Sequence, residues 1–236
     1  MKSSFLPLIT MLALLVLVYA TTCWGDEKIS PEPEQIAEQL RQRYAGIESL
    51  SFDFVQQTSG EMAGRSKRGA GRALFSSHGA QPRMRWDYDE PDYQVIISDG
   101  TTVSMYFAQL NQQIIAPVEQ AQTDLLFSFF SGRTPLAESF LITDADDAVL
   151  SRLVSLPSLR VIRLQPLDPR TNISAVHLFI TDEYLIERLV ITDFFDTVTI
   201  IDIQGVLIDP LASEDEGAIA ALFTFSPPEG TEIIYQ

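Results

Sequence analysis

Cysteine and histidine are almost absent from this sequence, which has one cysteine and two histidines in 236 residues. A lone cysteine, Cys23, cannot form an internal disulfide framework. His78 and His177 are far apart in the chain, and neither stands beside a nucleophile in a recognisable pattern. A solvated or ordinary strand histidine is therefore the simpler interpretation of each. So few thiol and imidazole ligands also argue against a transition-metal site.

Sequence motifs of common enzymes and cofactor sites are missing as well. The chain has no Gly-x-Ser-x-Gly elbow, phosphate-binding loop or dinucleotide-binding glycine pattern. Asp144, Asp146 and Asp147 could bind calcium, but their loop lacks the glycine and the spaced glutamate of a calcium loop, so a solvated acidic turn is the better interpretation. We expect no metal, no cofactor and no enzymatic activity.

Basic residues are scarce. The chain has 16 lysines and arginines against 32 aspartates and glutamates, a formal net charge of −16 at pH 7. Such a surface repels nucleic acid and the anionic faces of membranes, and it favours a soluble monomer. Nucleic-acid binding is therefore excluded. Hydrophobic residues still make up 46% of the chain, which suits a soluble protein that encloses apolar material.

Only one long apolar run occurs, from Phe5 to Ala20, and it follows the basic Lys2. The run is short for a transmembrane span, and small residues follow it, as in an export signal. We expect residues 1–25 to be a signal peptide and residues 26–236 to form a single domain, because the chain shows no repeat or linker. Cleavage after Ala20 or after Gly25 fits this pattern.

Two helices are predicted. Ser30-Pro31-Glu32 is typical of a helix start, and the apolar spacing that follows predicts an amphipathic helix over 31–48. The second, over 124–131, is apolar nearly all round and ends before Gly132 and Pro135.

The rest of the chain has the period-two alternation of strands. In the strand 83–89, Met84, Trp86 and Tyr88 alternate with polar residues, and Asp99-Gly100 predicts a hairpin turn. Further strands are predicted at 50–55, 73–76, 94–98, 102–107, 112–117, 140–143, 160–165, 175–181, 187–193, 198–205 and 223–225. The fold class is therefore mainly β with a few helices.

The many aromatic and aliphatic residues admit two interpretations. Phe52, Phe54, Trp86 and Leu178 could simply form a packed β core. Alternatively, a strongly curved antiparallel sheet would have an apolar face too large for two modest helices to fill, which leaves a hydrophobic cavity or groove.

Several motifs resemble those of one family. They are Gly71-Arg-Ala-Leu-Phe75, Arg85-Trp86-Asp87-Tyr88 followed by Pro91, Gln94 and Ser98-Asp99-Gly100, and the closing Phe223-Thr-Phe225-Ser-Pro227-Pro228-Glu-Gly230. In this order, after an export signal, the set is similar to that of the periplasmic outer-membrane lipoprotein carriers, the LolA family.

The resemblance implies an unclosed, strongly curved antiparallel β-barrel, lidded by short helices around a hydrophobic cavity. It also implies a periplasmic chaperone that receives acylated lipoproteins from an inner-membrane ATP-driven transporter and delivers them to an outer-membrane lipoprotein receptor. Cavity and lid residues are then expected to be Ile36, Leu40, Phe52, Phe54, Met84, Trp86, Tyr88, Leu126, Phe127, Phe129 and Phe130.

One departure concerns the lid. Family members have an Arg-Pro pair before the tryptophan strand, whose arginine reaches the lid, whereas this chain has Gln81-Pro82. Arg83 or Arg85 is the candidate replacement for that latch.

Two other functions fit the same fold. A lipidated Cys23 would make the protein an outer-membrane-anchored receptor, although Ala20-Thr21-Thr22 is a poor match to a lipidation signal. A periplasmic lipid-sensing or regulatory module is the other alternative.

Overall fold

The computed structural model describes residues 32–60, 64, 66–78, 81–118, 129–130, 135–146, 150 and 159–236. The predicted signal peptide, residues 1–25, lies outside these ranges, as do Leu126 and Phe127 of the predicted second helix. Within the described residues, no helix has both the length and the apolar character needed to cross a membrane.

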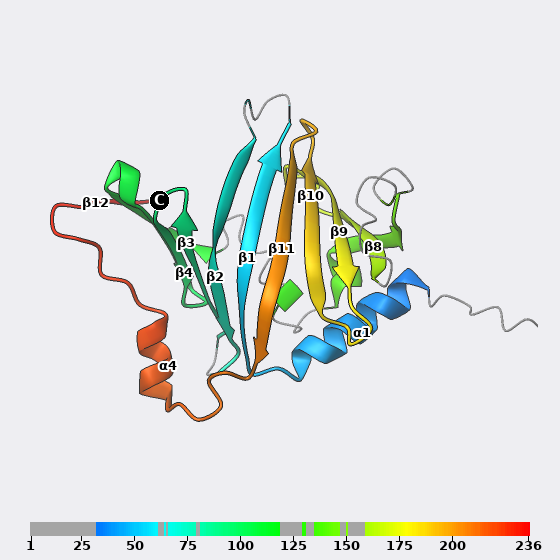
Figure 1. Ribbon diagram of the computed structural model, residues 1–236, viewed down its shortest axis with the longest axis horizontal. Helices are drawn as coiled ribbons and strands as arrows, with labels where there is room; N and C mark the ends of the chain where they lie inside the picture. The colour runs from blue at the N-terminus through cyan, green and yellow to red at the C-terminus, as the bar shows by residue number, and fades with distance from the viewer. Residues whose placement is uncertain are drawn as a thin grey trace, which may run out of the picture. The chain divides into compact units, whose positions relative to one another are not determined.

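Twelve strands form one sheet in the order β12-β6-β5-β4-β3-β2-β1-β11-β10-β9-β8-β7 (Figure 1). The edge strands β7 and β12 do not pair with each other, so the sheet is unclosed, as predicted. Two meanders, β1 to β6 and β7 to β11, are joined by the antiparallel pairing of β1 with β11. The strands are β1 (Ser49–Ser59), β2 (Lys67–Ser76), β3 (Arg83–Glu90), β4 (Gln94–Ser98), β5 (Thr102–Phe107), β6 (Gln112–Pro117), β7 (Phe140–Asp144), β8 (Arg160–Pro166), β9 (Ile173–Ile180), β10 (Ile186–Asp193), β11 (Val198–Ile208) and β12 (Glu232–Tyr235).

The C-terminal segment departs from the prediction. The strand expected at 223–225 is wrong, because helix α4 (Glu216–Leu222) ends at Phe223 and residues 224–228 have no regular structure. The Asp215 carboxylate starts α4 by accepting a hydrogen bond of 2.9 Å from the Ala218 N–H. The phenylalanine alternation mimics a strand, but the Phe225 ring packs on Tyr106, with ring centres 5.0 Å apart. The chain then forms β12, which pairs in parallel with β6, whereas the other described strand pairs are antiparallel.

The two faces of the sheet are best distinguished on β3, where successive side chains point to opposite sides. Met84 and Trp86 are buried on one face, which we call the inner face. Arg83 and Arg85 point to the other, outer face, where they contact α4.

The inner face is covered by helix α1 (Pro33–Ala45), which packs against β7, β8 and the 3-10 turn η3 (Leu136–Glu138). Its buried side chains recur every three or four residues, as predicted, although the helix is shorter than the expected span 31–48. Strands from β1 through β3 and from β7 through β11 all contribute to one buried cluster, so the sheet curls around this face.

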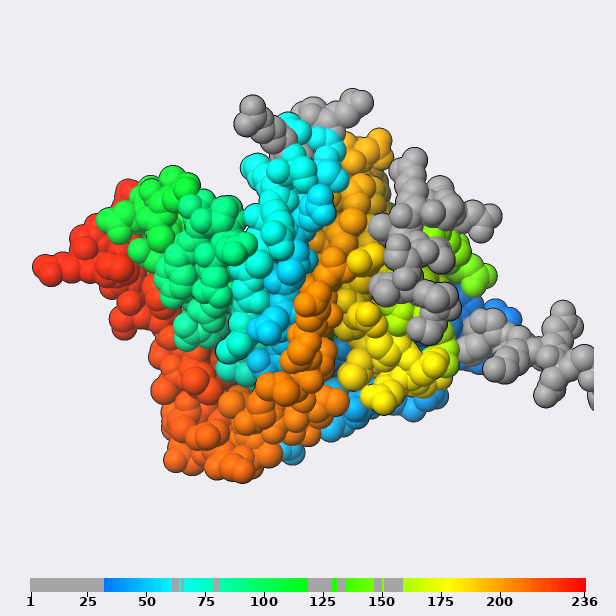
Figure 2. All heavy atoms as spheres, in the orientation of Figure 1, coloured from blue at the N-terminus to red at the C-terminus, as the bar shows by residue number. Residues whose placement is uncertain are grey.

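The outer face carries a much smaller buried cluster. Val95, Ile97 and Tyr106 of β4 and β5 pack there against Leu211, Ile219 and Phe223 from the C-terminal segment. In Figure 2 that segment lies beside β3 and β4, while α1 is mostly hidden behind the sheet.

Candidate functional site

The residues predicted to line a cavity or lid come together on the inner face. Most of them belong to one buried group of residues, which we call the inner-face cluster. Of the predicted residues that the structure describes, only Tyr88 is not a member, and it packs against the edge of the cluster. The members drawn from the prediction are Ile36, Leu40, Phe52, Phe54, Met84, Trp86, Phe129 and Phe130. The other two predicted residues, Leu126 and Phe127, lie outside the described residues.

The register of β2 explains how large rings fit side by side on this face. Ala73 of β2 stands between Phe52 on β1 and Trp86 on β3. Because the alanine is small, these two rings meet above it with centres 5.7 Å apart. Gly71 similarly stands between Phe54 and Tyr88, whose ring centres are 4.8 Å apart.

Gly71 also allows the strands themselves to approach. A Cβ atom on this glycine would lie 1.8 Å from the backbone oxygen of Asp87 on β3, so no larger residue fits without moving the strands. The small residues of the Gly71–Phe75 motif therefore set the position of the tryptophan strand.

Phe130 contacts three other aromatic rings. Its ring centre is 4.7 Å from that of Phe75, 5.3 Å from that of Phe52 and 5.8 Å from that of Tyr44. Phe129 stacks instead on Phe140 of β7, at 5.8 Å. These two residues thus connect β1 and β2 with the opposite end of the sheet.

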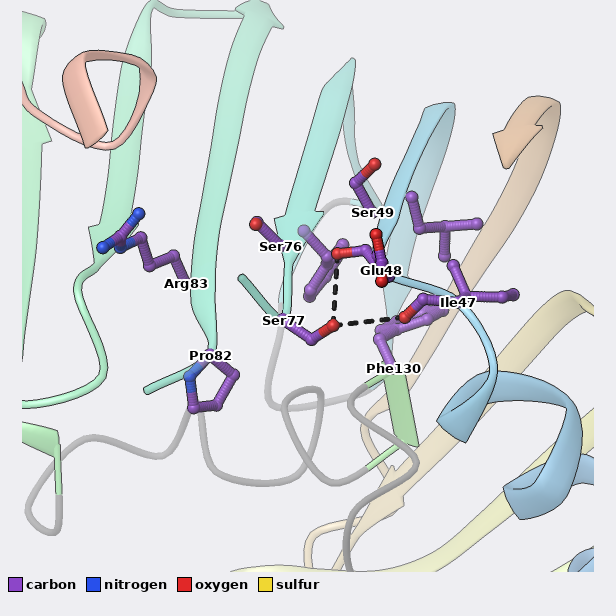
Figure 3. A pocket seen from close by; sticks show the side chains of 10 residues that line it. Ile47, Glu48, Ser49, Ser76, Ser77, Pro82, Arg83 and Phe130 are labelled. Carbon is purple, nitrogen blue, oxygen red and sulfur yellow. Dashed lines mark hydrogen bonds between the residues drawn. The ribbon is translucent and has the colours of Figure 1, made fainter. Parts of the chain in front are cut away.

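One small pocket borders this arrangement. A pocket beside Phe130, lined also by Ile47, Leu50 and Phe75, has a volume of about 10 Å³, close to the minimum that one water molecule needs. Figure 3 shows Phe130 next to Ile47, with the side chain of Arg83 directed away from both. The Ser77 hydroxyl donates hydrogen bonds to the backbone oxygens of Ile47 and Glu48. Aromatic side chains therefore pack closely around this pocket.

Few polar atoms enter the inner-face cluster. The Tyr44 hydroxyl accepts a buried hydrogen bond of 3.0 Å from the Ile186 N–H, which fixes α1 to the start of β10. Burial raises the pKa of Tyr88 to about 12, and its neutral hydroxyl donates to Gln56 at 2.9 Å. The Trp86 indole N–H is buried and has no acceptor among the described residues. The described residues of this cluster thus form a surface that is almost wholly apolar.

The two histidines lie apart from this site. His177 points to the outer face of β9, where its Nε2 is 3.2 Å from an Asp146 carboxylate oxygen. Burial lowers the pKa of His177, which outweighs the opposing effect of Asp146. His78 lies beside Ser76 and Glu48 instead. The described residues contain no group of three or more His, Cys, Asp or Glu side chains placed to hold a metal ion.

The candidate latch residues contact α4. Arg83 pairs with Glu216 in the first turn of this helix, and Arg85 Nη1 donates a hydrogen bond of 2.8 Å to the carbonyl oxygen of Leu222 at its end. Arg85 also forms a two-pronged contact with Asp87 on its own strand. In the part of the chain that the structure describes, both arginines hold the outer-face helix.

Sequence reasoning missed two aromatic members of the site. Tyr44 and Phe75 are not among the predicted cavity and lid residues, yet both rings contact Phe130. The helical spacing of Tyr44 from Leu40 and the alternation of Phe75 with Ala73 were the signals that could have identified them.

Comparisons with known proteins agree on one family. The family model described as "Outer membrane lipoprotein carrier protein LolA" matches residues 45–215. The outer-membrane lipoprotein carrier protein of Alcanivorax borkumensis is 26% identical over 235 residues, covering 97% of each chain. That of Bordetella avium is 27% identical over 198 residues, covering 84% of this chain and 86% of the relative.

Solved structures are similar at lower identity. A LolA-superfamily protein from Nitrosomonas europaea is 13% identical, with a TM-score of 0.44 over 83% of this chain and 99% of that one. A conserved protein from Thermus thermophilus is 13% identical, with a TM-score of 0.48 over 86% and 98%. Because the family model spans most of the sequence, the chain belongs to the LolA family of outer membrane lipoprotein carrier proteins.

Proposed function

We propose that this protein is a periplasmic chaperone that binds the acyl chains of lipoproteins released from the inner membrane and delivers them to the outer membrane. The observation that carries the proposal is the inner-face cluster, a large buried aromatic surface on one side of an unclosed sheet. Membership of the family, and the names of the relatives, supply the class of cargo. An ATP-driven transporter in the inner membrane and a receptor at the outer membrane are the partners that this role needs.

We propose that the inner face accepts cargo by a rearrangement of its side chains. A pocket of about 10 Å³ is far too small for an acyl chain, so cargo must displace side chains. We propose that the mobile group includes Phe130, which belongs to the predicted lid helix 124–131. An acyl chain would then replace the contacts that Phe130 makes with Phe52 and Phe75. Closing in this way hides the apolar surface from water between deliveries.

Energetics requires that loading be driven. Burial of an acyl chain stabilises a complex by about 0.8 kcal/mol per methylene, but the chain is already buried when it lies in a bilayer. Extraction by the carrier alone should therefore be negligible, which is the reason for an ATP-driven transporter. Unloading likewise needs an acceptor at least as apolar as the inner face.

Trp86 provides a direct test. The sequence has two tryptophans, Trp24 and Trp86, so a chain without residues 1–25 has Trp86 as its only one. We expect a synthetic peptide with a diacylglyceryl cysteine at its N-terminus to shift the emission of the buried Trp86, whereas the same peptide without acyl chains does not. Native mass spectrometry should show the bound peptide in the same sample.

Two results would count against the proposal. Loading confirmed by mass without any change in Trp86 emission would place the cargo away from the inner face. No loading in detergent-solubilised mixtures, where extraction costs little, would argue against acyl binding altogether.

A further inference from the structure

The turn between β10 and β11 exposes two adjacent aromatic side chains. Phe194 and Phe195 are 65% and 63% exposed. The Asp193 carboxylate accepts hydrogen bonds of 2.8 Å from the N–H groups of Phe195 and Thr197, and the Phe194 N–H donates to the carbonyl oxygen of Asn172. The backbone that carries the two rings is thus tied to its own strand and to the β8–β9 loop. Two large apolar side chains held outward together are rare on a soluble protein unless they contact something.

Neighbouring chain segments extend this exposed end of the sheet. Ser59 pairs with Val198, and Gly60 lies so close to Thr197 that a Cβ atom on it would be 2.9 Å from the Thr197 Cα. The end of β1 therefore lies directly against the β10–β11 turn, as Figure 1 also shows. On the other side of the turn, the β8–β9 loop exposes Leu167 at 56%.

Basic residues without ion-pair partners lie at the same end. Lys67 and Arg68 begin β2 opposite Thr58 and Gln57, which places them beside the end of β1. Both are exposed, and no described acidic residue forms an ion pair with either. Most described arginines are instead paired, namely Arg41, Arg72, Arg83, Arg85, Arg160, Arg163, Arg170 and Arg188.

The acidic groups at this end are partly engaged. Asp168 pairs with Arg170, and the Asp193 carboxylate accepts hydrogen bonds from the turn. Among the described residues, this leaves Asp196 as the exposed acid next to the rings. The chain as a whole has a net charge of −16, but charges further than about 8–10 Å from a surface are screened at physiological salt. The described residues therefore present a pair of aromatic rings beside two cations that have no ion-pair partner among them.

From this arrangement we infer that the end of the sheet formed by Phe194, Phe195, Lys67 and Arg68 docks on the surface of an anionic lipid bilayer. The rings enter the lipid–water interface, and the two cations lie among the headgroups. This contact goes beyond the proposed carriage of acyl chains and does not depend on it, because the residues lie outside the inner-face cluster.

Vesicle flotation tests the inference. The probe is vesicles of phosphatidylethanolamine and phosphatidylglycerol in a 3:1 ratio, with phosphatidylcholine vesicles for comparison, and the protein is the full chain after removal of its signal. We expect the protein to float with the anionic vesicles at physiological salt, where the net charge of the rest of the chain is screened. Phe194→Ser with Phe195→Ser should weaken binding at least tenfold, since half-burial of each ring is worth roughly a factor of ten in affinity.

Two further variants make the test specific. Lys67→Ser with Arg68→Ser should weaken binding to anionic vesicles several-fold, and remove the preference over phosphatidylcholine. Leu110→Ser with Leu207→Ser is the control. These two residues are 64% and 58% exposed but lie away from the β10–β11 turn, so their loss should leave binding unchanged. Circular dichroism confirms that each variant is folded.

Three results would overturn the inference. The first is the absence of binding to either vesicle type. The second is binding that survives loss of both phenylalanines, which would assign it to the inner face and its lipid-binding role. The third is a wild-type dimer that Phe194→Ser with Phe195→Ser converts to a monomer in analytical ultracentrifugation, because the rings would then serve contact between two copies.

Discussion

Two covers of the sheet are held by different forces: helix α4 on the outer face, and Phe130, beside α1, on the inner face. On the outer face, charged side chains fix both ends of α4, through Arg83 to Glu216 and through Arg85 to the Leu222 carbonyl. On the inner face, Phe130 is held by contacts between aromatic rings. The α4 attachment comes from β3, whereas the rings around Phe130 come from α1, β1 and β2.

This difference bears on function. Contacts between apolar groups have no fixed direction, so an acyl chain can replace the Phe130 ring at little cost. The bonds to α4 require donors and acceptors in fixed positions, which no acyl chain offers. We therefore expect the inner cover to exchange with cargo more readily than the outer cover.

The largest effect that separates the two covers is expected from matched truncations of phenylalanine. Phe130→Ala and Phe223→Ala remove rings that are buried to about the same extent, with 5% and 4% of each residue exposed. Each should lower the free energy of unfolding by roughly 3–5 kcal/mol. Only Phe130→Ala should also tighten binding of the acylated peptide, because the cargo no longer competes with the ring. Urea unfolding and fluorescence titration measure the two quantities, and equal effects of both variants on binding would remove the distinction between the covers.

A smaller loss is expected from a change where β2 packs against β3, the strand that holds the outer cover. Gly71→Ala places a Cβ atom 1.8 Å from the Asp87 backbone oxygen and should push β3 away from β2, lowering the free energy of unfolding by about 2–3 kcal/mol. Gly46→Ala is the control, since its added atom meets no other atom closer than 3.7 Å. If Gly71→Ala proved as stable as the control, the register of β2 would not determine how closely β3 approaches.

The smallest effect is expected from the attachment of α4. Arg85→Ala removes the hydrogen bond to Leu222 and should cost about 1 kcal/mol of stability, because the side chain is partly exposed. Binding of the acylated peptide should not change. Arg72→Ala breaks an ion pair whose side chains are 69% and 60% exposed and should have almost no effect on either quantity. A loss of peptide binding in Arg85→Ala alone would restore this arginine as a latch for the cargo site.

Local patterns were enough to predict much of the fold. The predicted bounds 94–98, 102–107 and 112–117 are those of β4, β5 and β6, because the alternation and the Asp99-Gly100 turn are properties of neighbouring residues. Helix α4 and strand β12 were missed, since they depend on contacts with β4, β5 and β6, which are distant in sequence.

In the candidate site too, the features set by neighbouring residues could be predicted, and those set by contacts between distant segments could not. Alternation on β1 and β3 was sufficient to place Phe52, Phe54, Met84 and Trp86 on one face. The partner of Arg83 could not be predicted, because it depends on α4 lying across the outer face.

Native mass spectrometry of the protein isolated from the periplasm of cells that express it tests the central claim most directly. The account predicts two populations, one at the mass of the chain without its signal and one heavier by an acylated lipoprotein. Collisional activation should release the acylated species, and Phe130→Ala should increase the loaded fraction. A protein that always emerges at its bare mass, even when lipoprotein release from the inner membrane is active, would contradict the assignment of this chain as a carrier.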